Sequence, residues 1–105
     1  MKTVLVTGAS RGIGRELALA FGKAGYAVGV HYHKEKAKAE AVVQEIFEAG
    51  NKEAEIFGCD VRDSIKVRQM MDGMVVRWGH LDVLVNNAGV TRDRTMTGAW
   101  KTCAR

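Results

Sequence analysis

The residues with the clearest chemical potential are the glycines of the segment Thr7-Gly8-Ala9-Ser10-Arg11-Gly12-Ile13-Gly14, which follows a short apolar run. When a strand feeds a helix through such a segment, the free N–H groups and positive dipole end of the helix attract a phosphate or pyrophosphate. The pattern therefore predicts a phosphate-binding loop, to which we assign Gly8, Ser10, Arg11, Gly12, Ile13 and Gly14. The alternative is a glycine-rich turn that only packs the helix against the strand.

The spacing of these glycines limits which nucleotides the loop could hold. The common dinucleotide fingerprint G-x-G-x-x-G is not matched, because Leu17 stands where its third glycine would fall. A Walker A loop for triphosphates also fails, because Gly14 is followed by Arg15 and Glu16 rather than by Lys-Ser or Lys-Thr. A nucleoside triphosphatase is therefore a poor alternative.

Hydrophobic periodicity predicts the elements that position this loop. Apolar runs at 2–6, 27–32, 54–59 and 81–85 predict strands. Helical spacing connects them, from Ile13 to Ala24, from Ala39 to Phe47 and from Val67 to Trp78, each run stopping before a glycine. Strands that alternate with helices predict a Rossmann-like α/β fold with a doubly wound parallel sheet in the order 3-2-1-4. The loops after the first and fourth strands then meet at the switch point, where ligands bind.

Two further segments fall at the same predicted edge of the sheet. Asn86-Asn87-Ala88-Gly89 follows the fourth strand, and Cys59-Asp60-Val61 follows the third. Together with the pattern T-G-x-x-x-G-x-G of residues 7–14, these segments resemble the cofactor site of the short-chain dehydrogenase/reductase family over residues 2 to about 95. Within that family the chain is most similar to the 3-oxoacyl-acyl-carrier-protein reductases and the related acetoacetyl-CoA reductases.

The resemblance implies a role for each of these residues. Asp60 and Val61 would flank the adenine ring, Asn86, Ala88 and Gly89 would line the nicotinamide-ribose side, and Asn87 would brace the adjacent strands. The implied activity is the reduction of a 3-oxoacyl thioester of acyl-carrier protein or CoA to the 3-hydroxyacyl form, a step of fatty acid biosynthesis. Without the resemblance, a turn or helix-capping role for Asp60 stays equally open.

The end of the second strand bears on the choice between the two nicotinamide cofactors. A carboxylate about 20 residues beyond the glycine loop binds the ribose of NAD and repels the 2′-phosphate of NADP. Here the chain reads His31-Tyr32-His33-Lys34, with no carboxylate before Glu35, while Arg11 and Lys34 can donate to a phosphate. The sequence therefore favours NADP(H) over NAD(H) as the cofactor.

Three residues of that strand end, His31, Tyr32 and His33, are assigned to the cofactor site. The alternative for the two histidines is a solvent-facing position, and a zinc site there lacks a third ligand. Cys59 and Cys103 lie far apart and are interpreted as ordinary reduced thiols. No metal site is predicted.

Reduction of a carbonyl needs a proton donor, and the resemblance implies a Tyr for it, assisted by a Lys four residues later, a Ser and an Asn. The one literal match to Tyr-x-x-x-Lys, Tyr32 with Lys36, is rejected because Tyr32 ends a strand at the adenine side. The only serines are Ser10, in the phosphate loop, and Ser64, near the start of the third helix. We therefore predict no catalytic residue, and we expect this chain alone to bind cofactor without turnover.

Residues 96–105 depart from the family pattern, which motivates the hypothesis of a truncated product or a shifted reading frame. The sheet would stop after about four strands and leave Val83-Leu84-Val85 as an uncovered edge. The oligomer contacts of the family mostly use later helices, so no oligomeric state is carried over.

Length and composition set the remaining limits. The 105 residues offer one domain, 1–105, interpreted as an incomplete NADP(H)-binding unit. A composition that is 47% hydrophobic and 27% charged excludes a disordered chain. Residues after 91 carry +3 of the net charge of +4, so no nucleic-acid partner is expected. No apolar stretch reaches the length of a membrane span, and a cytoplasmic location is predicted.

Two other functions stay open at this point. The chain could be a non-catalytic NADP(H)-binding or regulatory module that pairs with another chain, or a truncated gene product without activity. An enzyme that uses another nucleotide or S-adenosylmethionine is disfavoured, because such sites usually have an acidic ribose partner at the second strand.

Overall fold

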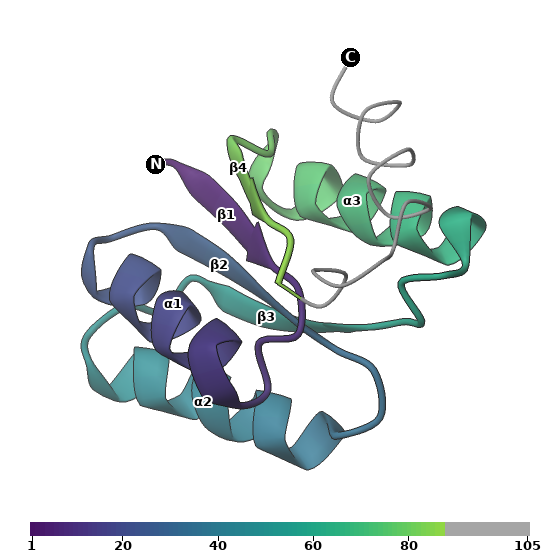
Figure 1. Ribbon diagram of the computed structural model, residues 1–105. Helices are drawn as coiled ribbons and strands as arrows, with labels where there is room; N and C mark the ends of the chain where they lie inside the picture. The colour runs from purple at the N-terminus through teal and green to yellow at the C-terminus, as the bar shows by residue number, and fades with distance from the viewer. Residues whose placement is uncertain (88–105) are drawn as a thin grey trace.

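Strands and helices alternate along residues 1–87, the part of the chain that the computed structural model describes. The elements are β1 (Thr3–Val6), α1 (Gly12–Lys23), β2 (Ala27–Tyr32), α2 (Lys36–Glu48), β3 (Ala54–Gly58), α3 (Ser64–Trp78) and β4 (Val83–Val85). The strands pair in parallel in the order β3-β2-β1-β4 (Figure 1). The predicted Rossmann-like α/β fold and its strand order are therefore confirmed.

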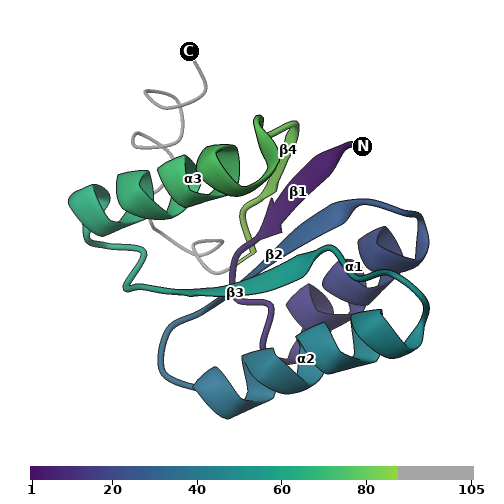
Figure 2. The ribbon, with the colours of Figure 1, turned by 180° about the vertical axis from the view of Figure 1, so that it is seen from behind.

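Helices cover both faces of the sheet (Figures 1 and 2): α1 and α2 lie on one face and α3 lies on the other. Successive side chains of β1 point to opposite faces. Val4 and Val6 join the apolar cluster beneath α1 and α2, whereas Leu5 packs with Met71 and Met74 of α3. Burial on both faces explains why the strands read as almost continuous apolar runs.

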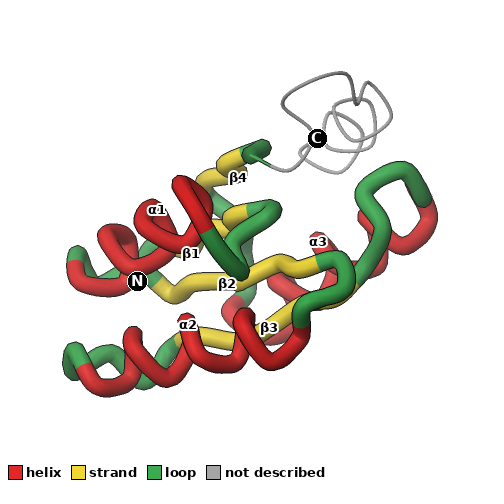
Figure 3. Tube along the Cα trace, turned by 60° about the horizontal axis from the view of Figure 1, so that its bottom comes forward, coloured by secondary structure: helices red, strands yellow, loops and turns green. Residues whose placement is uncertain are grey.

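The loops that follow the strands gather at one edge of the sheet. Figure 3 shows the loops after β2 and β3 leaving the sheet from the same end. The glycine loop after β1 joins them, because the Ala9 N–H donates to the His31 carbonyl at 2.8 Å. The Cys59 N–H, after β3, donates to the Tyr32 carbonyl at 3.2 Å. The Thr7 N–H donates to the Val85 carbonyl at 3.0 Å and so adds the segment after β4. These segments form one continuous surface, called here the carboxyl edge.

Polar groups close the opposite edge of the sheet, called here the amino edge. The fully buried Thr3 donates its N–H to Asp82 Oδ2 at 2.8 Å and its hydroxyl to the His80 carbonyl at 2.8 Å. The Asp82 N–H donates to Thr3 Oγ1 at 3.1 Å, and His80 Nε2 lies 3.0 Å from Asp82 Oδ2. These contacts fasten the start of β4 to the start of β1.

The helix ends follow the predicted glycines. Gly25, Gly50 and Gly79 have positive φ angles of 91°, 100° and 87°, directly after α1, α2 and α3 or one residue later. A left-handed residue at this position stops a helix at little cost only when it is glycine. The strand bounds shift slightly from the prediction, since β4 begins at Val83 rather than at 81, where the chain still turns to place Asp82 against Thr3.

Within residues 1–87, β4 is an edge strand, and Val83, Leu84 and Val85 are half-buried. The uncovered edge after four strands stays a prediction. The prediction of a single domain over 1–105 stays a prediction. The departure predicted for residues 96–105 lies outside the described residues.

Candidate functional site

The glycine loop between β1 and α1 is held in one shape by close backbone packing. Gly8 has a φ of 62°, which turns the chain sharply after β1. A Cβ at Gly14 would overlap the Gly8 carbonyl oxygen and lie 2.8 Å from Asn87 Nδ2. Asn87 itself donates from Nδ2 to that carbonyl oxygen at 3.2 Å. Asn87 therefore joins the loops after β1 and β4, whereas the role implied by the resemblance was a brace between the adjacent strands.

The start of α1 fits an anionic group. No side chain caps this helix end at Arg11, and the first turn contains no acidic residue. The N–H groups of a first helical turn have no intrahelical partner and attract negative charge. Gly12 has a φ of 63°, and a Cβ added there would meet nothing within 4 Å, so its surroundings are open, while Ile13 beside it is 72% exposed. The loop thus offers donors, charge and space to a phosphate.

His31 at the end of β2 connects three loops of the carboxyl edge. Its Nδ1 accepts from the Gly8 N–H at 2.9 Å, and its Nε2 lies 2.8 Å from the Cys59 carbonyl oxygen. Both hydrogen bonds form together only in a neutral imidazole that carries its proton on Nε2. Burial lowers the pKa of His31 from 6.5, with the charge of His33 adding to that effect. His31 is therefore a neutral brace between the glycine loop and the end of β3.

The buried position of His31 corrects one sequence-based alternative. The side chain is 1% exposed, so the solvent-facing interpretation is wrong for His31, whereas His33 is exposed. Helices cover both faces of the sheet, so side chains that point to either face of β2 can be buried. Tyr32 points to the other face, where its ring packs against Gly58, and it does not line the pocket beside the glycine loop.

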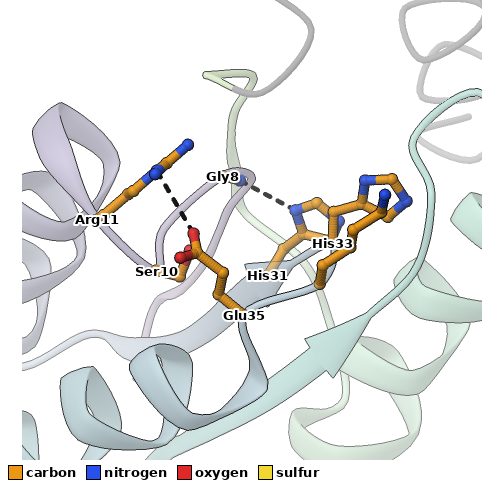
Figure 4. Close-up of a pocket in the computed structure, with 7 residues that line it drawn as sticks. Gly8, Ser10, Arg11, His31, His33 and Glu35 are labelled. Carbon is orange, nitrogen blue, oxygen red and sulfur yellow. Dashed lines mark hydrogen bonds and ion pairs between the residues drawn. The ribbon is translucent and has the colours of Figure 1, made fainter.

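An open pocket of about 350 Å³ lies beside the glycine loop, and this volume is within the usual range for small ligands. The residues that line it are Gly8, Ser10, Arg11, His31, His33, Lys34 and Glu35. Figure 4 shows His31 directed at Gly8, with Arg11 and Glu35 facing each other across the pocket. The structure thus brings together five of the residues predicted from the sequence.

The acidic member of the pocket, Glu35, was not predicted as a site residue. Arg11 Nε lies 3.4 Å from Glu35 Oε1, and Lys38 Nζ lies 3.0 Å from Glu35 Oε2. The hydrogen bond from Lys38, followed by the charge of Arg11, lowers the pKa of Glu35. Only residues 33–35 separate β2 from α2, so Glu35 sits directly above the strand end. This short connection is the sequence feature that could have identified Glu35 as a site residue.

Asp60 and Val61 occupy the next position along the carboxyl edge, after β3. Asp60 accepts from the Arg62 N–H at 2.9 Å and pairs with the Arg62 guanidinium at 2.8 Å. The Arg62 contacts hold the pKa of Asp60 well below its usual range. Asp60 is thus an ionised turn residue, while the cap of α3 is Asp63, whose carboxylate accepts from two backbone N–H groups. His33 Nε2 lies 3.7 Å from Asp60, and Val61 packs against the α3 cluster.

Asn86 follows β4 next to Asn87. Its Oδ1 is buried and has no hydrogen-bond partner among the described residues. A buried acceptor of this kind is uncommon and suits a site that a ligand completes. The predicted site residues Ala88 and Gly89 lie outside the described residues.

Metal-ligating clusters and membrane-spanning helices are both missing from the same part of the chain. Residues 1–87 contain no group of three or more His, Cys, Asp or Glu side chains arranged to share a metal ion. No helix in this range has the length and apolar character needed to cross a membrane.

Burial raises the pKa of the Cys59 thiol to about 11, so this thiol is protonated at neutral pH.

Comparison with known protein families shows which family the chain belongs to. Residues 2–102 match the family described as short chain dehydrogenase. The chain belongs to the short-chain dehydrogenase family. Its members are oxidoreductases that bind a nicotinamide dinucleotide, which agrees with the glycine loop and the open pocket described above.

The chain spans about a third of the length of three similar proteins. The 3-oxoacyl-[acyl-carrier-protein] reductase FabG of Staphylococcus aureus (strain Mu50) is 50% identical over 95 residues, which are 90% of this chain and 38% of that protein. A dehydrogenase/reductase structure from Sinorhizobium meliloti 1021 has a TM-score of 0.80 and 42% identity, over 84% of this chain and 34% of that one. A Burkholderia cenocepacia dehydrogenase structure with bound NADP has a TM-score of 0.76 and 30% identity, over 81% of this chain and 33% of that one.

Proposed function

We propose that this chain binds NADP(H) and forms the cofactor-binding part of a short-chain reductase that acts on 3-oxoacyl thioesters. The observation that carries the cofactor choice is the position of Arg11 and Lys34, which both line the pocket beside the uncapped start of α1. Two cations at this place favour a cofactor with an additional phosphate over NAD(H). The similarity to the Staphylococcus aureus reductase supports the thioester substrate class.

Each part of the carboxyl edge would hold one part of the cofactor. Gly12, Ile13 and Gly14 would bind the pyrophosphate through backbone N–H groups, while Ser10 and Arg11 would bind the 2′-phosphate. Asp60 and Val61 would flank the adenine ring, and Asn86, Ala88 and Gly89 would line the nicotinamide ribose. The bound cofactor would supply the hydride for reduction. The residues of this chain would bind and orient it.

Within residues 1–87, no Tyr-x-x-x-Lys pair lies at the pocket beside the glycine loop. The one Tyr-x-x-x-Lys match, Tyr32 with Lys36, joins a strand residue to the first residue of α2, and the Tyr32 ring packs against Gly58. A general acid must reach the substrate oxygen, and Tyr32 does not line the pocket beside the glycine loop. We therefore propose cofactor binding without turnover for these residues by themselves. The chain spans 38% of the length of the Staphylococcus aureus reductase, so the activity is a proposal for the whole enzyme.

A non-catalytic NADP(H)-binding module is the second candidate, and it shares the same site. A partner that supplies the tyrosine and lysine would restore turnover and exclude this candidate. No oligomeric state is proposed, and the cytoplasmic location stays a prediction.

Titration of the chain with NADPH and NADH tests the proposal, with binding followed by energy transfer from tryptophan to the nicotinamide. We expect saturable binding and a preference for NADPH of about tenfold, the scale of charge-assisted contacts to one phosphate. Arg11→Ala should remove most of this preference. Arg68→Ala removes the same charge from the exposed side of α3, away from the pocket, and should leave the preference intact. Equal or tighter binding of NADH by the unmodified chain contradicts the proposal.

A further inference from the structure

The pocket that would receive the 2′-phosphate is lined by a negatively charged side chain. Glu35 is the acidic residue among those that line it, and its carboxylate faces Arg11 across the pocket (Figure 4). The distance from Arg11 Nε to Glu35 Oε1 is 3.4 Å. Glu35 therefore engages the same guanidinium that the proposed function assigns to the cofactor phosphate.

Glu35 is held in this position from two sides. Lys38, one turn further along α2, contacts the other carboxylate oxygen at 3.0 Å. Glu35 also stands immediately before the first residue of α2, so the backbone of the helix start limits where its side chain can go. With cations on both sides, the carboxylate is ionised at neutral pH, as the lowered pKa of Glu35 indicates.

The charges in the pocket decide what this carboxylate does to a ligand. A phosphate monoester carries close to two negative charges at neutral pH. To bind at Arg11, it must share the guanidinium with Glu35 or displace it, and it is repelled by the carboxylate in either case. A ribose hydroxyl carries no charge and experiences no such repulsion.

We infer that Glu35 is a specificity-determining residue that weakens the binding of 2′-phosphorylated cofactors by acting as an internal counter-ion of Arg11. The inference rests on the proposed function, because it assigns the pocket to the 2′-phosphate. Glu35 thereby narrows the preference for NADPH over NADH that Arg11 and Lys34 create.

The test compares Glu35→Gln with the unmodified chain by titration with NADPH, NADH and adenosine 2′,5′-bisphosphate. Removing the carboxylate charge should tighten the binding of both 2′-phosphorylated ligands by about threefold, the scale of one exposed charge pair. NADH affinity should change by less than about 1.5-fold, since NADH lacks the 2′-phosphate that would lie beside Arg11 and Glu35. The gain should shrink at high salt, because ions screen exposed charges.

Glu40→Gln is the matched control, because Glu40 lies on the same helix, is exposed and does not line the pocket. This variant changes the net charge equally and should leave all three affinities unchanged. Unaltered or weaker binding of NADPH by Glu35→Gln overturns the inference, and weaker binding would mean that Glu35 positions Arg11 for the phosphate. If the unmodified chain folds by circular dichroism and binds no nicotinamide cofactor, the proposed function itself fails.

Discussion

The two edges of the sheet use polar groups in opposite ways. At the amino edge, the N–H of Thr3 donates to Asp82 and its hydroxyl donates to the His80 carbonyl. The His80 ring also contacts the Asp82 carboxylate. At the carboxyl edge, His31 and Asn87 fix the backbone of the glycine loop, while charged side chains above it border an open pocket. The amino edge fastens strands together, and the carboxyl edge holds a loop in shape while leaving room for a ligand.

This difference separates stability from binding. A change at the amino edge should weaken folding alone, because no residue there lines the pocket. A change to the braces of the carboxyl edge should weaken both, because the same contacts fold the loop and shape the phosphate site. Three substitutions and a change of pH should expose this contrast.

The largest effect is expected for His31→Leu. The substitution leaves the Gly8 N–H and the Cys59 carbonyl without their buried partner, which costs about 1–3 kcal/mol for each group. Cofactor affinity should fall with it, because the glycine loop loses its brace. Urea unfolding and NADPH titration measure the two effects. His31→Gln, which can accept at one atom and donate at another, should recover part of both, and failure of this recovery would argue against the bracing role.

Gly14→Ala should follow, with a loss of about 1–3 kcal/mol from overpacking. Its Cβ would overlap the Gly8 carbonyl oxygen, so the start of α1 must move away from the glycine loop. NADPH affinity should therefore drop as well. Gly25→Ala is the control at the other end of α1, where φ is 91° and an added Cβ would meet no atom within 4 Å. It should lower stability through backbone strain alone, and an equal loss of affinity in both variants would contradict the prediction.

Thr3→Val changes the amino edge while preserving the shape of the side chain. It removes the hydroxyl that donates to the His80 carbonyl and accepts from the Asp82 N–H, for an expected cost of about 1–2 kcal/mol. The ratio of NADPH to NADH affinity should stay the same. Chemical denaturation measures the loss of stability, and a separate titration in native buffer measures the affinity ratio. An altered ratio would show that the two edges are coupled.

The smallest effects are expected from pH, and the two edges should respond in different ranges. Burial lowers the pKa of His31 from 6.5, so its contribution to stability is present above that value and is lost as the pH falls below it. The Thr3 N–H lowers the pKa of Asp82 from 3.8, so that contribution persists to lower pH and is lost as the pH falls through the folded pKa. When the free energy of unfolding is measured from pH 7.5 to 3, the decrease that begins near pH 6.5 should be absent in His31→Gln. The decrease below pH 3.8 should be smaller in Asp82→Asn. Among the described residues, the lowered pKa values of Asp60 and Glu35 add to the acid sensitivity.

Much of the fold could be predicted because its signals are local. Apolar periodicity and the glycines after each helix marked the elements, and their alternation fixed the sheet order. The glycine loop was predictable for the same reason, since it directly joins β1 to α1. The brace through Asn87 depended on the family resemblance, because Gly8 and Asn87 lie far apart in the chain.

Side-chain partners across the sheet were harder to predict. The strand pattern did not reveal that His31 is buried, because a strand covered on both faces lacks polar alternation. Tyr32 was assigned to the cofactor site, yet its ring packs against Gly58 on the other face. Glu35 was noted only as the first carboxylate after the second strand, and the folded connection from β2 to α2 brings it to Arg11.

NADP(H) binding at the carboxyl edge is tested most directly by amide chemical-shift mapping of the chain during NADPH titration. The largest shifts should fall on residues 8–14, at the end of β2 and at Asp60, with little change at Thr3 and Asp82. Larger shifts at the amino edge than at the glycine loop, or saturable binding without shifts in residues 8–14, would contradict it.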